Sequence, residues 1–279
     1  DITKKDLEMI LDEVITRPEI MKITKDSEGN EFAELSGSFA ANAGITVRGT
    51  YQEDDSFHMD YYYPYVFGTS ITTNEQIDVE KHAEKESYAG VCDEVNLGVT
   101  LIFYIQNVAD YLAETNRHLS KIHYGAMLAG LSTEGKILCP VVERKKNDVP
   151  AIQKNDRHNQ LIAQAREGDE DAIESLTLED MDTYALLSQR VMKEDIFSIV
   201  KSTFMPFGIE SDQYTVLGEI IDCVTMENKL THEKLYGMKL LCNNIQFDVC
   251  INEKDLLGEP AIGRRFRGNV WMQGNLCLE

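Results

Sequence analysis

Apolar residues recur at helical spacing in the first segment of the chain. They are Leu7, Ile10, Leu11, Val14 and Ile15, and acidic side chains fill the opposite side. This pattern predicts an amphipathic helix over residues 3–16, which ends before Pro18. The polar residues 26–30 then predict a turn.

A hairpin is predicted next. Apolar and polar residues alternate with period two over residues 45–65, on both sides of a polar loop at residues 52–56. In the register that we favour, Arg48 lies opposite Asp60. Opposite charges in facing positions support this alignment.

The rest of the first half predicts further helices and a second hairpin. Residues 74–90 are polar and are predicted to be helical in part. Residues 97–113 predict a buried helix, because their apolar side chains follow the spacing i, i+4, i+7 and i+11. These side chains are Leu101, Ile105, Val108 and Leu112. Residues 122–142 predict a hairpin with its turn at residues 132–135.

The second half changes from helical to extended patterns. Residues 143–159 lack apolar periodicity and predict a linker, and helical signals follow over residues 161–191. Within them, residues 166–182 form a strongly acidic face. The predicted strands are residues 196–203, 214–225, 235–242, 245–251 and 265–273. Short strands of this kind favour a small antiparallel barrel of the oligonucleotide-binding or SH3-like type.

The predicted fold class is therefore α+β with three parts. Residues 1–145 form a domain of helices and antiparallel hairpins, residues 146–194 form the linker and an acidic helical connector, and residues 195–279 form the small β-barrel.

Composition narrows the class of protein. Hydrophobic residues make up 43% of the 279 residues, which is enough for a sizeable core and excludes wholesale disorder. The longest apolar run, residues 99–105, is far shorter than the ~20 residues of a membrane-spanning helix. The formal charge of −21 disfavours binding to nucleic acid or to anionic membrane surfaces.

The six cysteines form no CxxC pair and no zinc pattern. We therefore expect reduced thiols, no cofactor and a cytoplasmic location. No secretory signal is visible. The chain begins at Asp1 without a methionine, and we expect native residues before it.

Exposed polar and aromatic side chains are the main candidates for a binding surface. In the predicted hairpin, Arg48, His58, Asp60 and Tyr62 project from one face. They form either a ligand-binding surface or a cross-strand ion pair on a solvated face. The single tryptophan, Trp271, lies on the polar side of the last strand, where it forms an exposed hot spot or packs against the N-terminal half.

Two other groups of residues suggest alternative functions, a metal-assisted hydrolase and a nucleic-acid binder. Asp78, His82 and Glu86 have i, i+4, i+8 spacing and, with Asp93, could hold a metal ion for hydrolysis, although interleaved lysines also fit a solvated helix face. Trp271 beside the basic cluster of Arg264, Arg265 and Arg267 could stack on single-stranded nucleic acid.

The chain also resembles a known family. The segments that carry the resemblance are residues 82–92 (HAEKESYAGVC), 168–184 (GDEDAIESLTLEDMDTY) and 255–268 (DLLGEPAIGRRFRG). They resemble a bacterial family of unknown function that is typical of Gram-positive anaerobes. This resemblance implies a bacterial cytoplasmic protein and brings no site residues with it.

The sequence contains no GxSxG elbow, no phosphate-binding glycine loop and no cysteine beside a plausible histidine. We therefore expect a non-enzymatic module that binds a protein partner or a small ligand, with the hydrolase and the nucleic-acid binder as alternatives.

Overall fold

The computed structural model describes residues 3–82, 85–117, 123–141 and 200–278, together with the isolated residues 164, 169 and 175. Two compact units divide the chain: residues 1–138 with 202–279, and residues 139–201. The helices and strands whose bounds are given below all belong to the first unit. The predicted acidic connector, residues 146–194, lies outside the described residues except at those three isolated positions.

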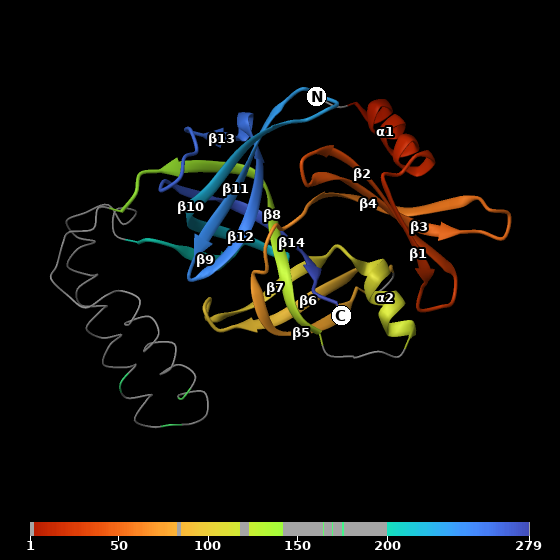
Figure 1. Cartoon of the computed structure of the whole chain (residues 1–279), viewed down its shortest axis with the longest axis horizontal. Helices are drawn as coiled ribbons and strands as arrows, with labels where there is room; N and C mark the ends of the chain where they lie inside the picture. Colours follow the sequence, from red (N-terminus) through yellow and green to blue (C-terminus); the bar gives the residue numbers. More distant parts are fainter. Residues whose placement is uncertain are drawn as a thin grey trace. The chain divides into compact units, whose positions relative to one another are not determined.

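The first unit is mostly β (Figure 1). Its elements are α1 (Lys4–Thr16), β1 (Ile20–Lys25), β2 (Glu31–Ala40), β3 (Ala43–Tyr51), β4 (Phe57–Val66), β5 (Thr73–Lys81), β6 (Tyr88–Glu94), β7 (Val99–Ile105), α2 (Val108–Asn116), β8 (His123–Leu138), β9 (Thr203–Pro206), β10 (Gln213–Glu227), β11 (Lys234–Cys242), β12 (Ile245–Asn252), the 3-10 turn η1 (Glu253–Asp255), β13 (Leu256–Leu257) and β14 (Arg265–Leu276). The predicted α+β class, with an N-terminal domain of helices and hairpins, is therefore wrong.

Strands β1 to β4 form an antiparallel sheet in chain order. Helix α1 covers one face and buries Leu11 and Val14 against Ala33, Leu35 and Val47. The alternation along β2 and β3 turns the intervening side chains toward the rest of the unit. The helix predicted over residues 3–16 and the turn at residues 26–30 are confirmed.

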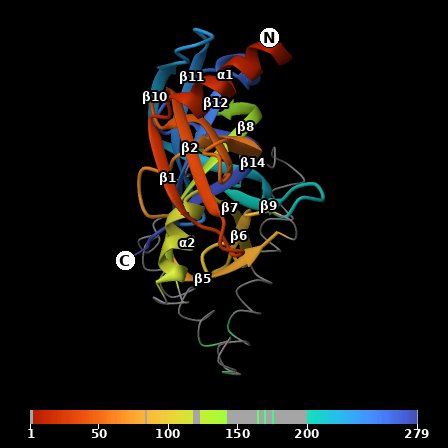
Figure 2. The ribbon, with the colours of Figure 1, turned by 90° about the vertical axis from the view of Figure 1, so that its right-hand side faces the viewer.

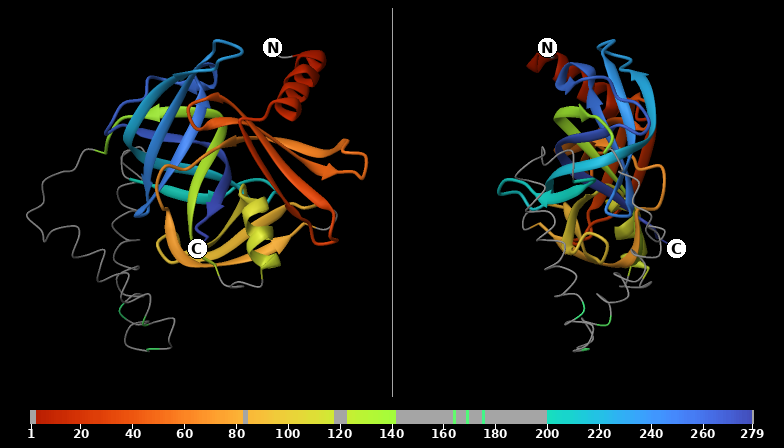
Figure 3. Two further views of the ribbon diagram at one scale, coloured as in Figure 1. Left: turned by 45° about the vertical axis from the view of Figure 1, so that its right-hand side comes forward. Right: turned by 90° about the vertical axis from the view of Figure 1, so that its left-hand side faces the viewer.

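The remaining strands form a second sheet whose pairings close two rings (Figure 3). The rings share the ladder between β8 and β14. Strands β12, β11 and β10 complete one ring, and β5, β6 and β7 complete the other. The C-terminal strands therefore do not form a separate small barrel, because β14 pairs with β7 and β8 from the first half of the chain.

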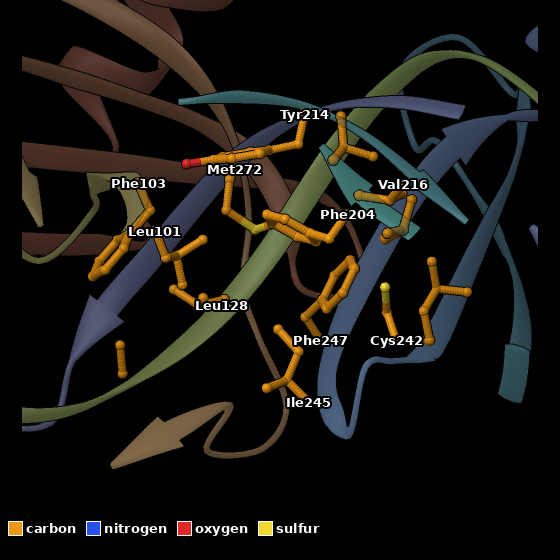
Figure 4. Packing of buried hydrophobic residues seen from close by; sticks show 14 of the residues in the cluster. Leu101, Phe103, Leu128, Phe204, Tyr214, Val216, Cys242, Ile245, Phe247 and Met272 are labelled. Atoms are coloured by element: carbon orange, nitrogen blue, oxygen red, sulfur yellow. The ribbon is translucent and has the colours of Figure 1, made fainter. Parts of the chain in front are cut away.

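Side chains from both rings build one hydrophobic core. Figure 4 shows Phe204, Phe247 and Met272 gathered beside β8, with Leu101 and Phe103 further along the same core. The rings of Phe204 and Phe247 meet edge to face with centroids 6.0 Å apart.

The helix predicted over residues 97–113 is instead strand β7 followed by α2. Leu101, Phe103 and Ile105 alternate inward and are fully buried, so the same apolar residues satisfy a strand as well as a helix. The β-branched and aromatic residues of this segment favour the strand. Residues 74–90 likewise belong mainly to β5 and β6 rather than to a helix.

The hairpin predicted over residues 122–142 is one long strand, β8. Its predicted turn coincides with a β-bulge, where the register with β14 shifts between Asn269 and Val270. The Ser132 hydroxyl donates to the carbonyl oxygens of Glu134 and Asn269 at this point. Turn-forming residues thus bend the strand without ending it.

Candidate functional site

A β-bulge in the β3–β4 hairpin changes the partner of Arg48. Gly49 lies opposite Met59. The preceding residue, Arg48, lies opposite Tyr61, so Asp60 is an extra residue with no partner on β3. The predicted pairing of Arg48 with Asp60 is therefore wrong.

Arg48 is fully buried and its guanidinium is surrounded by protein oxygens. Its Nε donates to Oε2 of Glu34, on the neighbouring strand, over 2.9 Å. The other donors go to the hydroxyl oxygens of Tyr61, Tyr63 and Tyr104, at 3.0, 3.0 and 2.9 Å, and to the carbonyl oxygens of Ile105 and Gln106, at 3.1 and 2.6 Å. These contacts join the four-stranded sheet to the end of β7.

The charge of Arg48 persists at this buried position. Burial would lower its pKa, but Tyr63, Glu34 and the other tyrosines hold that pKa well above its ordinary value. For Glu34, burial raises the pKa and Arg48 opposes the rise. The ion pair joins β2 to β3 within the four-stranded sheet, and the bonds of Arg48 to Tyr104, Ile105 and Gln106 reach the other sheet.

The structure does not bring the four predicted hairpin residues together. His58 and Asp60 are exposed, whereas Arg48 is buried. Tyr62 is 41% exposed and lies opposite Val47, whose side chain packs beneath α1. Tyr62 is therefore on the opposite face of the sheet from Arg48, and its role in binding stays a prediction.

Trp271 packs against the N-terminal half of the chain. Its ring lies 5.3 Å from the ring of Tyr104 and 6.4 Å from that of Tyr63, centroid to centroid. Its Nε1 donates to Oδ2 of Asp212 over 2.7 Å. Burial raises the pKa of Asp212, and the hydrogen bond from Trp271 opposes that rise.

The arginines near Trp271 do not form an exposed cluster. Arg265 is buried, and Arg264 donates to the carbonyl oxygen of Glu259 over 2.7 Å. Because Trp271 is only partly exposed and packs against the rings of Tyr104 and Tyr63, the geometry gives little surface on which a base could stack.

The residues considered for a metal ion do not share one site. Glu86 accepts hydrogen bonds from the Ser27 hydroxyl and from Lys81 Nζ, both over 2.6 Å, and from the Tyr88 hydroxyl. Asp78 and Asp93 line a different, open pocket of about 300 Å³. Among the residues that the structure describes, no three His, Cys, Asp or Glu side chains could hold a metal ion.

No disulfide joins any of the six cysteines, all of which lie in the described residues. Burial raises the pKa of Cys92 and Cys242 to about 12 and that of Cys250 to about 11. Thiols with these pKa values are not nucleophiles near neutral pH.

Strand β1 is an open edge of the four-stranded sheet. It pairs with β2 on one side and with no strand of the described residues on the other. The apolar side chains of Ile20, Met21 and Ile23 are 44%, 51% and 48% exposed. Natural proteins usually blunt such edges, so an edge with three exposed apolar side chains is a candidate for pairing with another chain.

The outward backbone groups of β1 can be assigned from its hydrogen bonds. Asp26 N–H donates to the carbonyl oxygen of Asn30 over 3.0 Å, and the direction alternates along an antiparallel strand. The backbone N–H and C=O groups of Lys22 and Thr24 therefore also point toward β2, while those of Met21 and Ile23 point away from it, toward the open edge. The outward carbonyl of Lys25 accepts from Nδ2 of Asn116 over 2.8 Å, in agreement with this assignment.

Helix α2 lies beside β1 (Figure 2). Residues of both elements line a groove between them. Lys22 Nζ pairs with Asp110 Oδ2 over 2.5 Å, which anchors the helix at the middle of the strand. Toward the end of the strand the groove opens into a pocket of about 420 Å³. Its lining residues are Ile23, Thr24, Lys25, Glu31, Ala113, Asn116 and Arg117.

The sequence pattern alone does not predict this groove. The alternation that would predict strand β1 is short, because Met21 and Ile23 alternate with Lys22 and Thr24 over only six residues. No local pattern indicates that Ala113, Asn116 and Arg117, one face of α2, lie beside this strand.

A family model described as "Domain of unknown function, E. rectale Gene description (DUF3881)" matches residues 1–274. The chain belongs to this family. The family is described from a Gram-positive anaerobe, as the resemblance in the sequence implied. No curated protein and no solved structure matches the chain.

Neither helix in the described part of the chain is long and apolar enough to cross a membrane.

Proposed function

We propose that this chain is a non-enzymatic binding module of the bacterial cytoplasm that takes an extended segment of a partner protein as an additional strand on β1. The open edge of β1, with outward backbone groups at Met21 and Ile23, is the observation that carries the proposal. Strand addition gains affinity from main-chain hydrogen bonds and specificity from side-chain pockets beside the edge.

The edge also has the surroundings that such binding needs. Met21 and Ile23 offer apolar surface for alternate side chains of an added strand, and the groove beside α2 receives the others. Strand β1 is already ordered by its ladder to β2, and the ion pair of Arg48 and Glu34 links β2 to β3 behind it. A preformed edge lowers the ordering cost of binding.

Selection from an unbiased dodecapeptide display library on the full chain tests this function. We expect enriched peptides whose affinity falls at least about tenfold for Ile23→Pro, because proline removes an outward N–H while leaving the ladder to β2. Ile23→Thr keeps that N–H, and Ile71→Thr alters an apolar residue that is 54% exposed elsewhere. Both controls should retain more affinity than Ile23→Pro.

Circular dichroism and thermal melting establish that each variant is folded. Enriched peptides that bind Ile23→Pro as tightly as the parent would contradict the proposal, and so would a library that yields no binder.

A further inference from the structure

The pocket at the end of β1 carries positive charge on a molecule that is strongly negative overall. Lys25 and Arg117 are exposed, and no ion pair or side-chain hydrogen bond joins either of them to the described residues. The one acidic side chain of the lining is Glu31, so the pocket has a net positive charge. The chain as a whole has a formal charge of −21.

Local charge decides what the pocket attracts. At physiological ionic strength, exposed charges beyond about 8 Å are largely screened, so a carboxylate in the pocket responds mainly to Lys25 and Arg117. Arg117 can hold a carboxylate with two parallel hydrogen bonds, a geometry specific to the guanidinium group.

The direction of the added strand follows from the edge. Antiparallel pairs are more stable per residue and more frequent than parallel ones. A segment antiparallel to β1 places its N-terminal half beside Lys25, because β1 ends there. A chain terminus with a free carboxylate would lie at the other end.

We infer that the segment bound at β1 runs antiparallel to it and carries a side-chain carboxylate, from aspartate or glutamate, in its N-terminal half, held by Lys25 and Arg117. This inference rests on the proposed function and specifies the partner: an internal, extended, acidic segment of another protein. A second copy of this chain, paired through the same edge, is the alternative occupant that the measurements below distinguish.

Three blocked octapeptides, acetylated and amidated, test the inference by fluorescence anisotropy on the full chain. Valine alternates with polar residues in each. The first has two glutamates in its N-terminal half, the second has them in its C-terminal half, and the third has glutamines in place of those of the first. We expect the first to bind about tenfold more tightly than the other two, with an advantage that shrinks as salt rises.

Charge reversal supplies the matched variants. In Lys25→Glu/Arg117→Glu the advantage of the first peptide should disappear. Lys4→Glu/Lys5→Glu changes the net charge equally on exposed residues of α1 and should preserve it.

The possible outcomes distinguish a failure of this inference from a failure of the proposed strand addition. Equal binding of all three peptides that is still lost in Ile23→Pro would overturn the inference and leave strand addition standing. Tighter binding of the second peptide would assign a parallel strand and also overturn it. Sedimentation that shows a dimer, abolished by Ile23→Pro, would assign the edge to a second copy. Absence of peptide binding to any variant would count against both proposals.

Discussion

Arg48 and Glu34 face each other across β2 and β3, with 2.8 Å between Nη2 of Arg48 and Oε2 of Glu34, and both side chains are almost wholly withdrawn from solvent. Other hydrogen bonds from Arg48 reach Tyr104, Ile105 and Gln106, which belong to β7 and the residue after it. One side chain therefore connects the sheet that carries the β1 edge to the double ring.

Removing one partner of this pair should be severely destabilising. Arg48→Met leaves the Glu34 carboxylate buried without its countercharge, and losses of about 3–5 kcal/mol are typical for such changes. Urea unfolding of Arg48→Met, Glu34→Leu and the double variant measures the effect. We expect the double variant to be more stable than the sum of the two single losses implies, and strictly additive losses would contradict the pairing.

A buried amide pair should make a second contribution between the sheets. Gln273 donates from Nε2 to the carbonyl oxygen of Pro64 over 2.8 Å, and its Oε1 accepts from Nε2 of Gln106 over 2.8 Å. Gln273→Ala removes the donor to the Pro64 carbonyl and the acceptor of the Val66 N–H, while Gln106 Nε2 keeps its bond to the Val66 carbonyl. Each buried group left unpaired costs about 1–3 kcal/mol. Substitution of the exposed Gln76, also by alanine, should change the free energy of unfolding by less than about 0.5 kcal/mol.

Glu86 should make stability fall in acid. Burial would raise its pKa, but hydrogen bonds from Lys81, Ser27 and Tyr88 outweigh burial and hold the pKa below its ordinary value. A carboxylate with a lowered pKa stabilises the fold above the ordinary glutamate pKa, and this contribution is lost as pH falls through the lowered value. Urea unfolding between pH 3 and pH 7 should therefore show a shallower pH dependence in Glu86→Gln than in the parent, and identical slopes would refute this role.

The single tryptophan should report the ionisation of Asp212. Because burial raises the pKa of Asp212, its protonation should begin at a higher pH than for an ordinary aspartate and weaken the hydrogen bond from Trp271. The fluorescence of Trp271 should shift with pH in the parent and remain unchanged over the same range in Asp212→Asn. A shift of equal size in that variant would assign the titration to another group.

Local patterns predict those parts of the fold that depend on a few neighbouring residues. Helix α1 follows from the spacing between Leu7 and Ile15, and β12 follows from alternation. The Asn243-Asn244 turn joins β11 to β12 with both residues at positive φ, a conformation that asparagine tolerates. In each case the stabilising partners lie within one element or one hairpin.

Features that depend on distant partners were not predictable in this way. The spacing of Leu101 and Ile105 fits a helix as well as a strand, and only the ladders of β7 with β6 and β14 decide between them. The extra residue at Asp60 shifts the register by one residue, so that Arg48 lies opposite Tyr61, and no local pattern indicates this bulge. The predicted barrel failed for the same reason, because β8 supplies the partner strand from another part of the chain.

The candidate site shows the same limit. Tyr62 and Trp271 were predicted from their faces on single strands, yet they lie on opposite sides of the four-stranded sheet. The groove at β1 needs α2, which lies more than 80 residues later in the chain, as the pairing of Lys22 with Asp110 at a separation of 88 residues illustrates.

Amide hydrogen exchange by NMR, residue by residue along β1, tests the central claim most directly. In the free chain we predict fast exchange at Met21 and Ile23, whose N–H groups face outward, and slow exchange at Lys22 and Thr24, which bond to β2. Saturation with the octapeptide that has glutamates in its N-terminal half should protect Met21 and Ile23 and leave the exposed Tyr124 unchanged. Protection of Met21 and Ile23 in the free chain, or unchanged exchange there at saturation, would contradict strand addition at this edge.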